Sequence, residues 1–330
     1  MQEIHWINFI FGGNYIWLIE LPQSINNILE IIMTITISWI NHNIDTKELI
    51  LISDSRLRSY GAMDQCQKIF PLERGDCCLG FCGDAQIAYP LSVQASSALN
   101  NFIKTRTRSF DVLEIKDFLC KILNNLISSW DLKKSEKLTE LKETNIFFGG
   151  WSWKKSDFII GYFKYDDSGF VYHKRKTNLP HPFRDQNKSF LFLGDYQGDY
   201  EIEIKKILSA SFTNSHEKKH ISLKYEPLIA LNNILSRARN CTDFPLIGGE
   251  LQMVKIYQYG NTLPYVFRKS QGEHYLFGRK MFDWEKTERP IFHIQNDEVK
   301  FSYPLSIIPD VKSYTDDFFQ KIPQSEAEES

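Results

Sequence analysis

Thr34 is the residue whose type and position could support covalent chemistry in this chain. A threonine hydroxyl is a weak nucleophile until a neighbouring base removes its proton. At the start of a chain the free α-amine can be that base, since its reference pKa of about 7.7–8.0 lies close to neutral pH. Thr34 would combine nucleophile and base once everything before it has been removed. On patterning alone Thr34 is an ordinary strand residue, because β-branched side chains are enriched in strands.

The segment around Thr34 is predicted to form one arm of a β-hairpin. Met33–Trp39 alternates polar and apolar residues and is rich in β-branched side chains, which is typical of a strand. His42–Thr46 contains turn-forming residues, and Glu48–Ile52 is a second apolar strand. The second strand runs into Ser53-Asp54-Ser55, so the hairpin carries a carboxylate at its end.

A second group of short strands follows and leads into a helix. Cys66–Pro71 is a strand candidate that contains Lys68, and Cys77–Cys82 is a strand of small residues. Gly83-Asp84 then begins a helix whose apolar positions continue to Leu99. The Asp84 carboxylate is favourably placed near the positive end of that helix.

Strands and helices are grouped irregularly over the rest of the chain. Phe110–Trp130 is the clearest helix, because apolar residues recur at every third or fourth position. Two further helices are predicted, one from Gly194-Asp195 to Leu208 and one at Pro227–Arg239. Further strands are predicted at Asn145–Trp151, Phe158–Tyr165, Phe170–His173, Phe190–Leu193, Leu251–Tyr257 and Tyr265–Phe267. This order argues for an α+β or layered fold rather than a βαβ alternation.

The ordered set of motifs resembles the N-terminal-nucleophile hydrolases, specifically proteasome β subunits and the bacterial peptidase HslV. The matching motifs are Met33-Thr34, Ser53-Asp54-Ser55, Lys68 within Gln67–Phe70, and the Gly-rich strand end Leu79–Ala85. Members of that family begin with Thr after processing, and they carry an Asp at the end of the second strand and a Lys on the third. The resemblance covers roughly Thr34–Phe267.

The resemblance implies a role for several of these residues. Lys68 would lie beside the Thr34 hydroxyl, where its positive charge would favour the deprotonated forms of its neighbours. Asp54 would pair with Lys68 and hold it charged and oriented. Gly83 matches the oxyanion-hole glycine of the family, whose N–H would stabilise the tetrahedral intermediate by on the order of 3–4 kcal/mol.

The chain departs from the family pattern at three places. The Gly-Ser-Gly turn reads Gly194-Asp195-Tyr196, so Asp195 replaces a supporting Ser and could accept a hydrogen bond from the α-amine. The late Asp-x-x-Ser-Gly-Gly motif reads Asp243–Gly249 with one extra residue; Asp243 carries over, whereas Ile247 stands near the position of the Ser. Met33 replaces the Gly that precedes the Thr in self-cleaving β subunits.

Residues 1–33 precede the candidate nucleophile and have two explanations. Met33 is the initiator and is removed because Thr follows, in which case residues 1–32 reflect the choice of start site; alternatively, residues 1–33 are a propeptide that Thr34 cleaves at the Met33–Thr34 bond. Ile4–Leu21 is apolar and aromatic, but no Lys or Arg precedes Lys47. That pattern argues against an export signal or a membrane anchor.

The overall composition disfavours other kinds of partner and site. The chain has 39 basic and 41 acidic residues, a net charge of -2, and no basic stripe with interleaved aromatic residues, so nucleic acid is a poor candidate for a partner. The six cysteines form no C-x-x-C pair, and Cys and His residues do not cluster at the short spacing of a zinc site. We expect reduced thiols, as in a cytoplasmic protein.

The resemblance implies a four-layer αββα sandwich, in which two antiparallel sheets pack face to face between helix layers. Residues 34–268 would form this hydrolase domain, and residues 269–330 a C-terminal extension that ends in an acidic, disordered tail. The implied activity is that of a threonine peptidase that needs no metal or organic cofactor.

The implied partners are a peptide or protein substrate, further copies of the chain in a homo-oligomer or ring, and an ATPase unfoldase. Two alternatives stay open. One is an inactive structural or regulatory member of the same fold, and the other is a small-molecule amidase of the same superfamily.

Overall fold

The computed structural model of the chain consists of two compact units, Met1–Ile31 and Ile32–Ser330. It describes residues 6–11, 14–19, 34–42, 46–58, 61–130, 138–166, 168–174, 179, 189–212, 223–240 and 246–304. The first unit contains an antiparallel hairpin of β1 (Trp6–Phe11) and β2 (Asn14–Ile19). The second unit contains every other described element.

One sheet of the second unit has five strands among the described residues. Their order is β11-β10-β9-β8-β7, and each neighbouring pair is antiparallel. The strands are β7 (Ile69–Pro71), β8 (Cys77–Cys82), β9 (Asn145–Ser152), β10 (Asp157–Asp166) and β11 (Gly169–Lys174). The strands predicted for Cys77–Cys82 and between residues 145 and 173 are thereby confirmed.

The other sheet has nine strands within the described ranges. Its main path is β12-β3-β4-β13-β14-β15-β16; β17 pairs parallel to β14, and β18 pairs antiparallel to β17. The strands are β3 (Ile35–His42), β4 (Lys47–Ser53), β12 (Phe190–Gly194), β13 (Gln252–Tyr257), β14 (Asn261–Arg268), β15 (His274–Leu276), β16 (Arg279–Lys280), β17 (Ile291–Gln295) and β18 (Glu298–Ser302). The predicted hairpin of β3 and β4 is confirmed, with Thr36 opposite Ser53.

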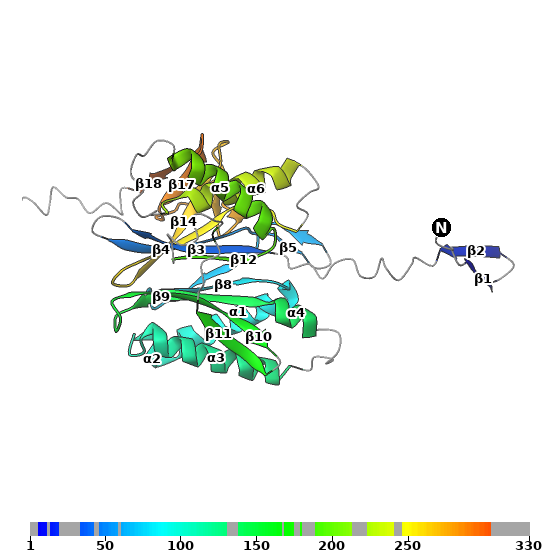
Figure 1. The fold of residues 1–330 in the computed structure, drawn as a ribbon, viewed down its shortest axis with the longest axis horizontal. Coiled ribbons are helices and arrows are strands. Elements are labelled where there is room, and N and C mark those ends of the chain that lie inside the picture. Colours follow the sequence, from blue (N-terminus) through cyan, green and yellow to red (C-terminus); the bar gives the residue numbers. More distant parts are fainter. Residues whose placement is uncertain are drawn as a thin grey trace, which may run out of the picture. The chain divides into compact units, whose positions relative to one another are not determined.

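Helices lie on the outer face of each sheet (Figure 1). α1 (Ala85–Asn101) and α3 (Val112–Ser128) pack on the five-stranded sheet through one apolar cluster. α5 (Gln197–Phe212) and α6 (Glu226–Asn240) pack on the nine-stranded sheet through another. The helices α2 (Ile103–Arg106) and α4 (Leu138–Glu143) are short. The described part of the chain is thus an α+β structure with two largely antiparallel sheets and six helices.

A third apolar cluster lies between the two sheets. Leu51 belongs to this cluster, whereas Ile52 packs under α5 and α6, because successive side chains of a strand point to opposite faces. β8 contributes the small side chains of Cys78 and Cys82 to the space between the sheets. Both faces of β4 and β8 are therefore buried, which explains why these strands read as continuous apolar runs.

The starts of two predicted helices follow from capping. Asp84 accepts a hydrogen bond from Ile87 N at 3.1 Å and caps α1, and Asp111 caps α3 through Leu113 N at 2.9 Å. The strand predicted for Cys66–Pro71 is too long, since β7 begins only at Ile69. Lys68 N donates to the Gln252 side chain at 3.0 Å instead of to a neighbouring strand.

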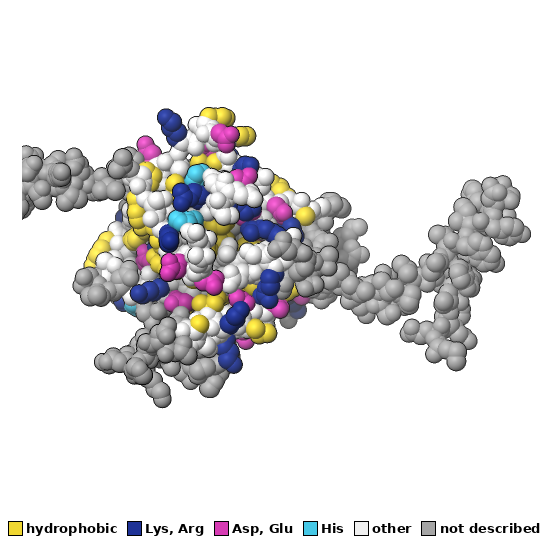
Figure 2. All heavy atoms as spheres, turned by 90° about the horizontal axis from the view of Figure 1, so that it is seen from above, with side chains coloured by type: hydrophobic (Ala, Val, Ile, Leu, Met, Phe, Trp, Pro, Cys, Tyr) yellow, Lys and Arg dark blue, Asp and Glu magenta, His cyan; other side chains and the backbone are white. Residues whose placement is uncertain are grey.

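The surface carries charges of both signs. Lys and Arg side chains are interspersed with Asp and Glu on the face shown in Figure 2, in keeping with the small net charge of -2. No helix within the described ranges is long and apolar enough to cross a membrane. The five cysteines in the described part of the chain form no disulfide bond.

The segment predicted as a C-terminal extension contributes β15, β16, β17 and β18 to the nine-stranded sheet. Phe292 of β17 is fully buried, and its ring lies 5.1 Å from that of Phe267 on β14. Phe301 of β18 covers the buried Lys255 ammonium at 4.6 Å, and Lys255 is paired with Glu48 at 3.2 Å. The acidic tail beyond residue 304 lies outside the described residues.

Phe292→Ala should destabilise the whole second unit, because it removes a fully buried ring that joins β17 to β14. We expect the free energy of unfolding in denaturant to fall by about 3–5 kcal/mol. Phe282→Ala is the matched control, since Phe282 is 60% exposed, and it should cost less than about 0.5 kcal/mol. Equal losses in the two variants would contradict integration of the C-terminal strands into the core.

Candidate active site

Thr34 lies directly before β3, at the edge where β3 pairs with β12. Its side chain is fully buried, and its carbonyl oxygen accepts a hydrogen bond from Asp195 N at 3.3 Å. Gly194 pairs with Ile35 and has a positive φ of 117°. A Cβ at Gly194 would overlap the Thr34 carbonyl oxygen, so this position must be glycine.

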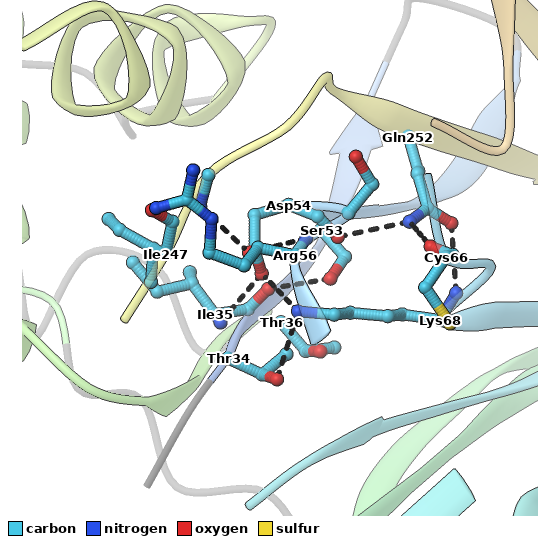
Figure 3. A network of polar contacts seen from close by, with 12 residues as sticks. Thr34, Ile35, Thr36, Ser53, Asp54, Arg56, Cys66, Lys68, Ile247 and Gln252 are labelled. Carbon is cyan, nitrogen blue, oxygen red and sulfur yellow. Dashed lines mark hydrogen bonds and ion pairs between the residues drawn. The ribbon is translucent and has the colours of Figure 1, made fainter. Parts of the chain in front are cut away.

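Lys68 connects Thr34 with Asp54, as the resemblance implied. Lys68 Nζ donates to Thr34 Oγ1 at 3.0 Å and to Asp54 Oδ1 at 2.9 Å (Figure 3). All three side chains are fully buried. The structure thus brings together three residues that come from the start of β3, the end of β4 and the segment before β7.

The Asp54 carboxylate is held by backbone donors as well as by Lys68. Ile35 N donates to Oδ1, and Arg56 N and Gly248 N donate to Oδ2, each at 3.2 Å. A buried carboxylate is costly unless its lone pairs are used, and these bonds together with the ammonium use them. Asp54 is therefore held in one orientation by the surrounding backbone and by Lys68.

The Lys68 ammonium is balanced between two opposing effects. Its complete burial lowers its pKa from the ordinary lysine value, and the charge and hydrogen bond of Asp54 oppose that change. The backbone of Lys68 is held by Gln252, which accepts from Lys68 N at 3.0 Å. Gln252 Nε2 in turn donates to the carbonyl oxygens of Asp54 at 3.0 Å and Cys66 at 2.7 Å.

Hydrogen bonds from β3 and β4 fix the backbone on either side of the site. Ser53 Oγ donates to the Ile35 carbonyl at 2.8 Å, which ties the end of β4 to the start of β3. Thr36 Oγ1 donates to the Phe81 carbonyl at 2.7 Å and so links the two sheets. Thr36, a polar residue of the predicted strand Met33–Trp39, thus makes a specific contact between the two sheets.

Arg56 holds the backbone at Ile247, the position near which the family pattern has a Ser. Its guanidinium forms a two-point ion pair with Asp64, with Nε–Oδ1 at 2.6 Å and Nη2–Oδ2 at 2.9 Å, and Nη1 donates to the Ile247 carbonyl at 3.1 Å. The neighbouring Gly248 supplies an N–H to Asp54. At Ile247 and Gly248 it is the backbone, and not a side-chain hydroxyl, that reaches the site.

Gly83 has a local structural explanation that does not involve Thr34. It follows β8 with a φ of 111°, and a Cβ there would lie 2.7 Å from Thr144 Cα and 2.8 Å from the Glu143 carbonyl oxygen. Both the positive φ and this close approach require glycine. Its assignment as an oxyanion donor stays a prediction.

Asp195 is the most unusual group beside Thr34. Its Oδ2 is buried without a hydrogen-bond partner in the described part of the chain. Burial raises its pKa to about 7, the charges of Glu143 and Asp54 add to that rise, and Lys68 opposes it. Burial also raises the pKa of the nearby Cys82 thiol to about 12, so Cys82 serves as a small core residue rather than as a thiolate nucleophile.

The structure does not place the last predicted site residue, Asp243. Asp243 lies outside the described residues. Within the described ranges, no group of three or more His, Cys, Asp or Glu side chains could hold a metal ion. Comparison of the sequence with models of known protein families and with curated proteins gives no match.

Asp195 should make the protein less stable as the pH rises toward neutrality. Its pKa of about 7 in the folded protein exceeds the ordinary value of 3.8, so the folded state holds a proton that the unfolded chain has already released. The stabilising contribution is complete below about pH 4 and is lost as the pH rises through about 7.

We expect Asp195→Asn to raise the free energy of unfolding at pH 8 by about 1–2 kcal/mol relative to the parent, an amount reduced for partial exposure of the carboxyl. At pH 4 the two proteins should differ little. Denaturant unfolding at both pH values measures this, in a Thr34→Ala background that keeps the N-terminus constant. If the difference in unfolding free energy between the two proteins is the same at pH 4 and pH 8, the raised pKa of Asp195 is refuted.

Proposed function

We propose that the chain is an amide-bond hydrolase in which Thr34, once it is the first residue, acts as the nucleophile. The observation that carries the proposal is the hydrogen bond from Lys68 Nζ to Thr34 Oγ1 at 3.0 Å, made by an ammonium that is also paired with the buried Asp54 at 2.9 Å. A buried ion pair directed at a hydroxyl is costly to maintain for packing alone. It suits a site where negative charge develops on that oxygen.

The arrangement of the layers supports the same proposal. Each sheet has helices on its outer face, and an apolar cluster joins the two inner faces. We propose that this is the four-layer αββα sandwich of the N-terminal-nucleophile hydrolases. The nucleophile then lies at the start of β3, next to the end of β12.

The proposed reaction begins when the α-amine of Thr34 takes the proton from Oγ1, which attacks the carbonyl carbon of the substrate amide. The tetrahedral intermediate collapses as the C–N bond breaks, and the proton passes to the leaving amine. Water then hydrolyses the Thr34 ester and restores the hydroxyl. Lys68 stabilises the developing negative charge on Oγ1, and Asp54 keeps Lys68 in place.

By the same resemblance, we propose a threonine peptidase that acts on a peptide or protein substrate. A small-molecule amidase would acylate at Thr34 and hydrolyse acyl-amide compounds but no peptides, so a substrate panel separates the two. An inactive member of the fold would not acylate at all. Assembly into a ring and action with an ATPase unfoldase are extensions of the peptidase proposal.

Thr34→Ala should abolish processing of the full-length chain. We expect the intact mass of the purified wild type to correspond to a protein that begins at Thr34, whereas Thr34→Ala should retain residues 1–33. If both proteins keep Met1, the α-amine is blocked, and the chain is expressed from Met33 so that removal of Met leaves Thr34 first. If protein that begins at Thr34 is never acylated by a covalent threonine-directed probe, the enzyme proposal is wrong.

Lys68→Met should remove the stabilising charge beside Oγ1 and slow acylation by about 100-fold or more. Lys255→Met is a matched control, because Lys255 is also a buried lysine paired with a carboxylate, Glu48, which lies opposite Asn41 at the far end of β3 from Thr34. Both variants should lose stability, and only Lys68→Met should lose the acylation rate per folded molecule. Time-resolved acylation assays, with folding checked by circular dichroism, test this. Equal rates in the two variants would remove Lys68 from the mechanism.

A further inference from the structure

The turn between β15 and β16 lies directly against the residue that follows Asp54. This turn is Phe277-Gly278, and Gly278 has a φ of 77°. A Cβ at Gly278 would overlap Ser55 Cβ and lie 2.5 Å from Ser55 Oγ. It would also come within 3.6 Å of Gln252 Nε2. The C-terminal segment therefore contacts the support of the proposed site with no space between them.

Ser55 makes four hydrogen bonds at that point, which join it to two separate stretches of backbone, residues 64–66 and 248–250. Ser55 N donates to the Gly248 carbonyl at 3.0 Å, and the Ser55 carbonyl accepts from Cys66 N at 3.0 Å. Ser55 Oγ donates to the Asp64 carbonyl and accepts from Glu250 N, both at 2.7 Å. Movement of Ser55 would thus move Asp54, its neighbour in sequence, and Gly248, whose N–H binds the Asp54 carboxylate.

The turn is itself held in place on both sides. Phe277 packs against the apolar cluster between the two sheets. Lys280 N donates to the Gln65 side chain at 3.3 Å, and Met281 N donates to the His274 carbonyl at 2.8 Å. Because the turn is anchored by these contacts, it forms a rigid contact with Ser55.

We infer that the β15–β16 hairpin positions the Asp54–Lys68 pair, and that Gly278 is the positioning residue through which it acts. This inference rests on the proposed function of Thr34. Gln252 and Ser55 are the two side chains nearest Gly278: Gln252 holds the backbones of both Lys68 and Asp54, and Ser55 is the next residue after Asp54. Contact at Gly278 thereby sets the geometry of the ammonium at Oγ1. A shift of about 1 Å in a catalytic group can slow a reaction about 100-fold, so a disturbed contact at Gly278 should slow acylation measurably.

The test compares Gly278→Ala with Gly272→Ala. Both glycines have a positive φ, 77° and 85°, so alanine introduces similar backbone strain at each. Only the Cβ at Gly278 strikes Ser55, since nothing lies within 4 Å of a Cβ at Gly272. In protein that begins at Thr34, we expect the acylation rate constant of the folded fraction to fall at least about tenfold for Gly278→Ala, with Gly272→Ala close to wild type.

A double-mutant cycle separates positioning from a general loss of structure. Ser55→Gly removes the atoms that the new Cβ of Gly278→Ala would strike, so adding Gly278→Ala to Ser55→Gly should slow acylation no further. A full additional slowing in that background would overturn the inference. So would equal acylation by wild type and both single glycine variants.

Amide hydrogen exchange keeps the inference testable if the wild type does not acylate, an outcome that removes the proposed function by itself. Exchange at the N–H groups of Ser55, Arg56 and Gly248 should accelerate in Gly278→Ala and not in Gly272→Ala. Unchanged exchange at these amides would show that the hairpin does not position the backbone around Asp54, whether or not the protein is an enzyme.

Discussion

The buried pair of Lys68 and Asp54 is the interaction on which the rest of the site depends. Removing two charges from water costs more than their attraction returns unless further hydrogen bonds complete both groups. Here the carboxylate receives three backbone N–H groups and the ammonium reaches Thr34 Oγ1. Much of the surrounding architecture, including the turn at Gly248, keeps those donors in register. The same contacts thus stabilise the ion pair and orient the Thr34 hydroxyl.

The sequence is sufficient to predict features that depend on local pattern. α1 and α3 are predictable because apolar periodicity and an acidic cap occur within one segment, and the β3–β4 hairpin because alternation surrounds a polar turn. Residue type and order select Thr34, Asp54 and Lys68, and the structure places them in contact. Asp195 stands out in the sequence as a departure from the pattern that the chain resembles, but its buried oxygen, which has no hydrogen-bond partner among the described residues, is visible only in three dimensions.

Other contributors to the site could not be predicted, because their contacts join distant parts of the chain. Gln252 is 184 residues from Lys68 and 198 from Asp54. In the sequence Gln252 is simply one of two polar residues, with Lys255, in a short strand. Gly278 falls in an extension outside the resemblance, and nothing near it in sequence indicates that it meets Ser55. The predicted strand Cys66–Pro71 is too long for a related reason: a side chain from β13 takes the N–H of Lys68 that a longer strand would have used.

The contact between Ser55 and Gly278 also has a consequence for the order of events during translation. The two residues are separated by 223 positions (278 − 55). At about 5–20 residues per second, a ribosome needs roughly 10–45 s to add that length of chain. During this interval the nascent polypeptide already carries Thr34, Asp54 and Lys68 but lacks the hairpin that closes against them. In the function that we propose, an unfinished chain would therefore hold Thr34 in an immature site, and reactivity toward amide bonds would be deferred until the β15–β16 hairpin has been made.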